Sequence, residues 1–364
     1  MSNITYPYSN GTGYSNGTSY GGSLKTTNLT GEYSNGTGYG NETLIMDPSL
    51  CTLDTCDLSL SSFNYLPNVA GNTIYAALFA IICVAQLGLG IKFKTWGYMA
   101  ALMLGLITEV IGYIPRVVLH YYPFDNDYFL MYLICLTIAP AFLTAGIYLC
   151  LSRIVIIYGQ EISRFKPGTY TIIFCSCDLI SLVLQAVGGA IATVADNTED
   201  SDLGKNLMLA GLAFQCFSLL LFAILCGDFA WRVRNAKGSW NPRYLDLVNS
   251  LLFKCFLGAL FLATLTIGIR SIYRCVELSG GFKGELFVGH EAEFMVLEGV
   301  MISIAALALT FFHPGLAMRG AWLEANFEFR TKKGGLEPLS RKSIGSDIEM
   351  GERRKSVGSE IEMD

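Results

Sequence analysis

Ionisable side chains interrupt several long apolar stretches of this chain, and their spacing groups them on helical faces. Glu109 and Arg116 are seven residues apart, so two helical turns bring them to the same face. Arg270, Arg274 and Glu277 follow one another at intervals of four and three residues. Opposite charges in an apolar environment are most easily accommodated by pairing. We therefore expect the three arginines and Glu277 to take part in structural ion pairs.

A second set of polar residues forms one stripe. Asp178, Ser181 and Gln185 follow at intervals of three and four residues, and Glu298 stands in the last apolar stretch. Buried carboxylates can hold a cation such as an ammonium group while apolar walls hold a hydrocarbon tail. We interpret Asp178, Gln185, Glu109, Glu298 and Ser181 as candidate substrate-binding residues of an amphiphile-binding cavity. The alternative interpretation is an ion-pair network that only fixes helix packing.

The sequence contains little that indicates an enzyme. Its only histidines are His120, His290 and His313, and the predicted topology places the first two and the third near opposite membrane faces. Neither a His-Glu-x-x-His nor a Gly-x-Ser-x-Gly sequence is present, and no Gly-x-x-x-x-Gly-Lys-Ser/Thr sequence could cradle a nucleotide phosphate. We expect no catalytic residue, no metal and no cofactor. The net charge of -5 argues against a nucleic-acid partner.

The elements that must position these residues are seven apolar segments. The chain is 52% hydrophobic and only 15% charged. Each segment approaches the roughly 20 residues that cross about 30 Å of hydrocarbon, and none shows the alternation of a barrel strand. The sequence therefore predicts an all-α polytopic membrane protein with a bundle of seven transmembrane helices. The expected segments are 70–91, 96–119, 128–152, 170–194, 205–229, 250–275 and 291–313.

Loop charges predict the orientation of the bundle. Nine cations follow the first, third and fifth segments, whereas Lys205 and Lys283 are the two that follow the second, fourth and sixth. Because cytoplasmic loops carry the excess of Lys and Arg, we expect the N-terminus outside and the C-terminus in the cytoplasm. The nine are Lys92, Lys94, Arg153, Arg164, Lys166, Arg232, Arg234, Lys237 and Arg243.

The segment 1–69 is expected to be extracellular, of low complexity and mostly disordered. It contains six Asn-x-Thr sequons, and N-glycosylation at such sites needs exposure on the lumenal side. The expected glycosylation sites are Asn3, Asn10, Asn16, Asn28, Asn35 and Asn41. Cys51 and Cys56 are expected to form a disulfide there. An unmodified low-complexity repeat is the alternative for the sequons.

The segment 314–364 is expected to be a cytoplasmic tail. It contains a tandem near-repeat, at 341–350 and 354–363, and in each copy a serine follows two basic residues. We interpret Ser343 and Ser356 as candidate phosphorylation sites, with an unmodified solvated tail as the alternative.

Residues on six of the seven expected helices carry a family resemblance. The motifs are Glu109-x-x-Gly112-Tyr113-x-x-Arg116; Ala139-Pro140-Ala141-Phe142 with Tyr148; Asp178-x-x-Ser181-Leu182-x-x-Gln185-Ala186-x-Gly188-Gly189; Ala210-Gly211-Leu212-x-x-Gln215; Arg270-x-x-Tyr273-Arg274-x-x-Glu277; and His290-Glu291, Glu298 and His313-Pro314-Gly315. With them the chain resembles the fungal seven-span lipid-translocating exporters of the aminocholesterol-resistance type. Within that family it is most similar to the yeast translocator of sphingoid long-chain bases. Glu298 stands where an Asp is usual in the family.

The resemblance implies a function. It implies a plasma-membrane protein, not an enzyme, that moves sphingoid bases or similar amphiphiles toward the outer leaflet or out of the cell and so confers resistance to toxic lipids. The expected ligands are membrane lipids, and the sequence indicates no protein partner. One alternative is a receptor-like lipid sensor that regulates membrane asymmetry. A seven-span ceramidase is disfavoured because the histidines cannot meet.

Overall fold

The computed structural model describes residues 65–194, 198–236, 238, 240–280, 291–318 and 321–324, together with 31–32, 38–39, 51–53, 55–56, 58 and 61. Within these ranges seven helices are long and apolar enough to cross a membrane, which confirms the predicted all-α fold class. Six of them are α2 (Val69–Phe93), α3 (Trp96–Val118), α4 (Asn126–Tyr158), α5 (Pro167–Val194), α6 (Thr198–Asn235) and α8 (Leu251–Ser279).

The seventh spanning segment is built from consecutive pieces. They are α10 (Glu291–Phe294), the π-helical turn η6 (Met295–Val300), α11 (Met301–Phe311) and, after a break, α12 (Pro314–Ala317). The break falls at His313, whose Nδ1 accepts a 3.0 Å hydrogen bond from the Gly315 amide. The shorter elements are β1 (Gly31–Glu32), β2 (Gly38–Tyr39), η3 (Gln160–Ile162), η5 (Pro242–Tyr244), α7 (Leu245–Asn249) and α13 (Ala321–Glu324), with β1 and β2 paired antiparallel.

Polar residues fix where the long helices begin. The side chains of Asn68, Asp125 and Ser250 each accept a hydrogen bond from a backbone amide in the first turn of α2, α4 and α8. Such caps satisfy donors that no helical carbonyl can reach. At the other end of α2, Lys94 adopts the left-handed conformation with φ 55°, and the chain turns into α3. We call the two ends of the bundle the Asn68 end and the Phe93 end.

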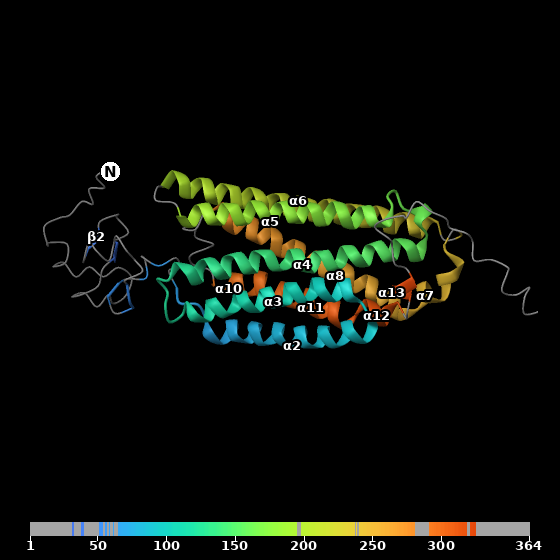
Figure 1. Cartoon of the computed structure of the whole chain (residues 1–364), viewed down its shortest axis with the longest axis horizontal. Helices are drawn as coiled ribbons and strands as arrows, with labels where there is room; N and C mark the ends of the chain where they lie inside the picture. The colour runs from blue at the N-terminus through green and yellow to red at the C-terminus, as the bar shows by residue number, and fades with distance from the viewer. Residues whose placement is uncertain are drawn as a thin grey trace, which may run out of the picture. The chain divides into compact units, whose positions relative to one another are not determined.

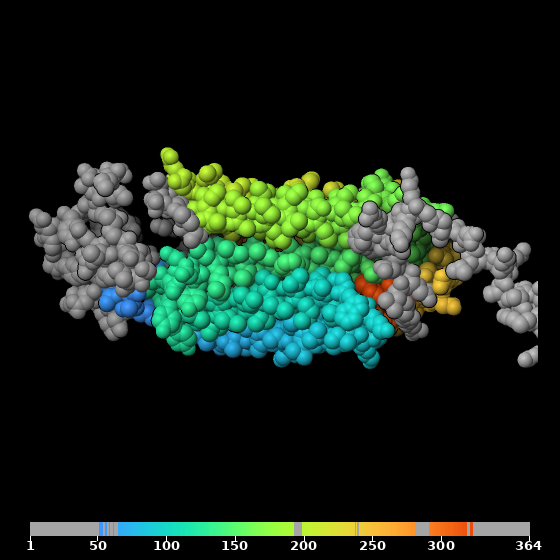
Figure 2. All heavy atoms as spheres, viewed as in Figure 1, coloured from blue at the N-terminus to red at the C-terminus, as the bar shows by residue number. Residues whose placement is uncertain are grey.

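Exposed and buried side chains lie on different faces of the helices. Apolar residues on the outer faces of the helices stay exposed, as lipid-facing residues do; they include Val84, Leu251, Phe261 and Phe311. Helix α4 buries the largest share of its spanning window and lies between the pair α5–α6 and the pair α2–α3 (Figure 1). Figure 2 shows α5 and α6 on one side of the molecule and α2 and α3 on the other. Helix α4 therefore contacts a helix of each pair, α3 on one side and α5 on the other.

Glycine permits a close contact between α5 and α6. A Cβ built on Gly188 would lie 2.5 Å from the backbone nitrogen of Met208 and 2.7 Å from the carbonyl oxygen of Gly204. A Cβ on Gly204 would lie 2.5 Å from the backbone nitrogen of Ala192. Because the obstructing atoms are backbone, no side chain can move aside. Small residues of this kind let membrane helices approach closely.

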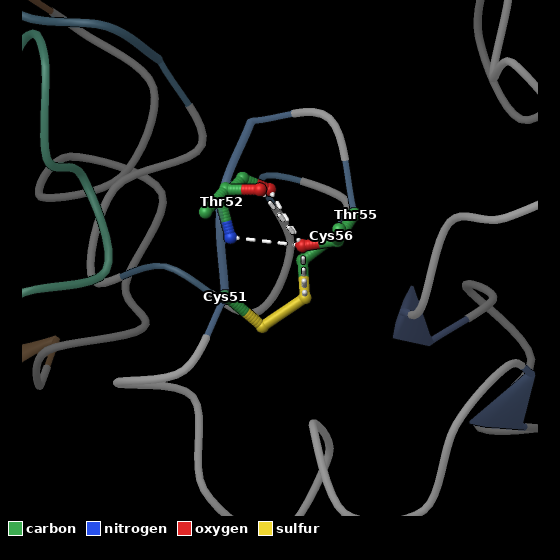
Figure 3. Close-up of a disulfide and its surroundings, with 4 residues drawn as sticks. All are labelled: Cys51, Thr52, Thr55 and Cys56. Carbon is green, nitrogen blue, oxygen red and sulfur yellow. Dashed lines mark hydrogen bonds between the residues drawn. A yellow bond between two sulfur atoms is a disulfide. The ribbon is translucent and has the colours of Figure 1, made fainter.

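Cys51 and Cys56 are joined in a disulfide that closes a short loop (Figure 3). Within the loop the Thr52 amide donates to Thr55 Oγ1 at 2.9 Å. Both cysteines pack with Phe124, which lies between α3 and α4. The predicted pairing of the two cysteines is thus present in the structure, and its loop rests at the Asn68 end of the bundle.

Several expected sites lie outside the described residues. They are the six sequon asparagines and the tail serines Ser343 and Ser356. The chain divides into two units, Met1–Phe327 and Glu328–Asp364, and the second contains both copies of the near-repeat. The first unit includes α12 and α13, so packed structure continues past residue 313, the last residue of the seventh segment expected from the sequence.

Candidate functional site

The charged residues of α8 and η6 meet in the interior of the bundle. Arg270 Nε donates to Glu298 Oε1 at 3.0 Å, and its Nη2 contacts the same oxygen. Arg274 pairs with Glu277 one turn further along α8, and its Nε lies 3.8 Å from Glu298 Oε2. All four side chains are at most 4% exposed. The structure therefore brings together four residues that the sequence analysis singled out on two separate segments.

A proline on α4 explains why Arg270 points where it does. The carbonyl of Leu136 would normally accept a hydrogen bond from the amide of residue 140, but Pro140 has no N–H. Arg270 Nη2 donates to this Leu136 carbonyl instead. The next residue, Thr137, accepts from Arg274 Nη2 at 3.3 Å. Two consecutive residues of α4 thus anchor both guanidinium groups.

Glu298 lies in the π-helical turn η6, which the sequence analysis did not predict. Tyr75 of α2 packs against this turn, and its hydroxyl donates to the Met295 carbonyl at 2.8 Å. A Cβ on Gly299 would lie 2.4 Å from the Tyr75 ring, so the contact requires glycine. Single π-helical turns are frequent at functional sites. This one sets the position at which Glu298 meets Arg270.

Glu109 of α3 lies beside these ion pairs but outside their hydrogen bonds. It is 1% exposed, and neither carboxylate oxygen has a hydrogen-bond partner among the residues that the structure describes. The charges close enough to act on it are Glu298, Arg270 and Arg274. Arg116, which shares the helical face of Glu109, is therefore not its hydrogen-bond partner.

Arg116 instead occupies a site formed largely by aromatic residues. Its Nε donates to Asn72 Oδ1 at 3.1 Å and its Nη2 to the Tyr65 hydroxyl at 3.2 Å. The guanidinium carbon lies 3.8 Å from the centroid of the Phe294 ring and 5.1 Å from that of Tyr132. Aromatic faces stabilise a desolvated guanidinium. The sequence pattern indicates no role for these neighbours, because tyrosine and phenylalanine in an apolar segment cannot be distinguished from ordinary core residues.

Asp178 of α5 faces α4. The hydroxyls of Thr144 and Tyr148 both donate to its Oδ2 at 3.0 Å, whereas Oδ1 has no partner within the described ranges. Tyr148 is fixed in turn by the ring of Phe222, whose centroid is 4.6 Å away. One carboxylate oxygen is therefore held in place by the protein, and the other is left for a further donor.

The rest of the polar stripe on α5 is divided between neighbours. Gln185 Nε2 donates to Gln215 Oε1 of α6 at 2.9 Å, and its own Oε1 has no partner in the described part of the chain. Ser181 donates to the Cys177 carbonyl of its own helix at 3.0 Å. The three residues of the stripe thus contact α4, α6 and α5 itself, and only Asp178 and Gln185 keep a side-chain oxygen that makes no hydrogen bond within the described residues.

Two polar groups therefore lie in the interior, one around Glu298 and one around Asp178. They are linked through α4, where Thr137 contacts the first and Thr144 the second. Seven residues of helix separate these contacts by roughly 10 Å. No group of His, Cys, Asp and Glu side chains that could hold a metal ion occurs in the described ranges.

Comparison with known proteins gives consistent matches. The family described as "RTA1 like protein" matches residues 102–321. The sphingoid long-chain base transporter RSB1 of Saccharomyces cerevisiae is 34% identical over 284 residues, which are 70% of this chain and 74% of that protein. Protein RTM1 of Saccharomyces cerevisiae is 29% identical over 62% of this chain and 72% of its own length. Protoporphyrin uptake protein 1 of the same species is 28% identical over 57% of this chain and 65% of its own. No solved structure matches.

Proposed function

Because this chain belongs to the RTA1-like protein family, we propose that it is a membrane lipid transporter that moves sphingoid long-chain bases toward the outer leaflet or out of the cell. The name of a relative that is 34% identical supports this substrate class. In this role the protein confers resistance to toxic sphingoid bases. Its ligands are membrane lipids, and the chemistry is not that of an enzyme.

The unbonded carboxylate oxygen of Asp178 is the observation that supports a ligand with an ammonium group. A sphingoid base is a primary ammonium on one long hydrocarbon chain, so its recognition needs a buried acceptor of charge-assisted hydrogen bonds next to apolar walls. Asp178 offers Oδ1, because Thr144 and Tyr148 engage only Oδ2. Gln185 supplies a second acceptor two turns away on α5.

The other candidate residues have different roles in this proposal. Glu109 and Glu298 are acceptors in the polar group around Glu298. Ser181 lines the face of α5 between Asp178 and Gln185. Arg270 and Arg274 hold Glu298 and Glu277 in place. A cation that passes between the two groups would move about 10 Å along α4.

Orientation and location are part of the proposal. The family resemblance supports a plasma-membrane location, and the loop cations favour an N-terminus outside. In that orientation the Phe93 end is cytoplasmic; there Asp228 contacts Arg164 at 3.0 Å and Arg232 at 2.8 Å. Asn3, Asn10, Asn16, Asn28, Asn35 and Asn41 would then be glycosylated, and Ser343 and Ser356 would be accessible to cytoplasmic kinases.

Reconstitution tests the function directly. The purified full-length chain is placed in vesicles that contain a labelled sphingoid base in one leaflet, and appearance of the label in the other leaflet is followed over time. We expect faster appearance than in protein-free vesicles. Binding of the labelled base without any increase in its movement would contradict transport and would favour the alternative, a receptor-like lipid sensor.

A further inference from the structure

Glu109 is a buried carboxyl group that takes part in none of the ion pairs around Glu298. Around Glu298 the described residues contribute two guanidinium groups, from Arg270 and Arg274, and three carboxyl groups, from Glu277, Glu298 and Glu109. The guanidinium groups are engaged by the first two carboxylates. Glu109, which is 1% exposed, is the third, and none of the residues described bonds to either of its oxygens.

A buried carboxylate without a counter-charge is unstable. Such a group either takes up a proton or is paired with a cation, because the isolated charge costs far too much in a medium of low polarity. The ligand proposed above is a lipid with one positive charge. A proton and an ammonium group would therefore satisfy Glu109 equally well in charge, but not at the same time.

We propose that Glu109 is the site at which a proton and the ammonium group of the substrate compete, so that each cationic lipid transported is exchanged for one proton. When the lipid enters, the Glu109 carboxyl O–H breaks, its proton passes to water, and the carboxylate pairs with the ammonium. When the lipid leaves on the other side, the carboxylate takes a proton from water there. The exchange moves no net charge. This assignment of Glu109 rests on the proposed function, the transport of a cationic lipid.

The groups that surround Glu109 are consistent with one exchangeable proton. They are Tyr113 of the same helix with Tyr75 of α2 next to it, Cys135 of α4, Arg270 and Arg274 of α8, and Glu298 of η6. Both arginines are already paired with carboxylates. This leaves Glu109 as the carboxyl group of the cluster that can change its charge without breaking an ion pair.

Buried polar atoms continue from Glu109 toward the Phe93 end. The order follows from the register of the helices: Tyr75 contacts Met295 and Thr95 lies 3.4 Å from His313, so α2 and the last spanning segment run side by side in the same direction, with residue offsets of 220 and 218 at the two contacts. The contact between Arg116 and Asn72 fixes the register of α3 against α2 in the same way.

In this register three further groups lie between Glu109 and Thr95. They are Ser303, Gln86 and Thr310, each buried, and their side-chain oxygens, together with the Gln86 amide nitrogen, bond to no other described residue. Successive groups are separated along the bundle by about 3–8 Å. One or two water molecules span such a gap, and buried polar groups of this kind are usually satisfied by water. We assign this series as the route by which the proton released from Glu109 leaves toward the Phe93 end, the side from which the lipid enters.

The test uses purified full-length protein in vesicles and two probes. The first is labelled sphinganine, whose movement between leaflets tests the proposed function alone. The second is N,N,N-trimethylsphinganine, a permanent cation that cannot cross as a neutral amine. It is followed under a pH gradient without a membrane potential, and then under a potential, set by potassium and valinomycin, without a pH gradient.

For one-to-one exchange we expect the trimethyl probe to accumulate about tenfold toward the acidic side per unit of pH difference. The potential alone should not drive it. If wild-type protein moves sphinganine but the pH gradient does not drive the trimethyl probe, or the potential does, exchange is wrong and the proposed function stands. If wild-type protein moves neither probe, the proposed function itself is wrong.

Two variants test whether Glu109 is the site of the exchange. Glu109→Asp keeps an exchangeable proton and should keep pH-driven accumulation, whereas Glu109→Gln cannot exchange one and should lose it. Accumulation of the trimethyl probe by folded Glu109→Gln would overturn the assignment to Glu109. Gln86→Leu should slow pH-driven movement without changing its final ratio, and an unchanged rate would overturn the proposed route.

Discussion

Two buried glutamates of this bundle, Glu298 and Glu109, differ in what their carboxyl groups contact. Glu298 is bonded to Arg270, whereas both oxygens of Glu109 have no partner among the described residues. We predict that Glu298→Gln lowers the free energy of unfolding by about 3–5 kcal/mol, because it leaves a buried guanidinium without its counter-charge. Glu109→Gln should leave it nearly unchanged. Thermal unfolding of both purified variants checks this, and equal losses would contradict the described charge pattern.

Asp178 permits a separation of recognition from packing. Asp178→Asn is nearly isosteric and can still accept from Thr144 and Tyr148, so we expect normal abundance at the cell surface. It removes the charge that an ammonium needs, so cells should lose resistance to added sphingoid base. Survival and surface abundance are measured in the same strain.

The control for Asp178 is the matched variant Thr144→Val, which removes one of the two donors that position the carboxylate but keeps its charge. It should retain more resistance than Asp178→Asn. Full resistance of Asp178→Asn at normal abundance would remove Asp178 from the site.

At this scale the sequence predicted which side chains share a helical face better than which side chains meet. Helical spacing grouped Arg270, Arg274 and Glu277 correctly, because all three lie on α8. It also grouped Glu109 with Arg116, yet Arg116 bonds to Asn72 and Tyr65 instead. Spacing within one helix says which side chains share a face, but not which group on another helix is nearer.

Between elements, the contact of α5 with α6 depends on glycine and can be tested by adding a single methyl group. Gly188→Ala and Gly204→Ala should each push the helices apart, because the new Cβ would meet backbone atoms 2.5 Å away. Overpacking of this kind costs about 1–3 kcal/mol. The matched control is Gly227→Ala on α6, where no atom lies within 4 Å. We expect a lower melting temperature for the first two variants and an unchanged melting temperature for the control. Three equal melting temperatures would contradict the described packing.

The sequence predicted the spanning helices and the family well, and the details inside the helices poorly. Continuous apolar runs located all seven helices, and the motifs on them indicated the family to which the chain belongs. The π-helical turn η6 and the contact of Arg270 with the Leu136 carbonyl were not predicted. A signal existed for the second, since Pro140 leaves that carbonyl without its helical donor. For η6 none was available, because its geometry depends on the packing of Tyr75 against Gly299.

For the molecule as a whole, the orientation in the membrane decides which end of the bundle receives the substrate. We predict that enzymatic deglycosylation of the chain expressed in a fungal host increases its electrophoretic mobility, because a lumenal N-terminus exposes the six sequons to glycosylation. Deletion of residues 1–43 should abolish the shift. The matched control replaces the six sequon asparagines by Gln, which keeps the length of the segment and should abolish the shift equally.

An epitope placed after Asp364 should be reached by antibody only after cells are permeabilised. Labelling of that epitope on intact cells would reverse the orientation, and the route from Glu109 to the Phe93 end would then open to the outside.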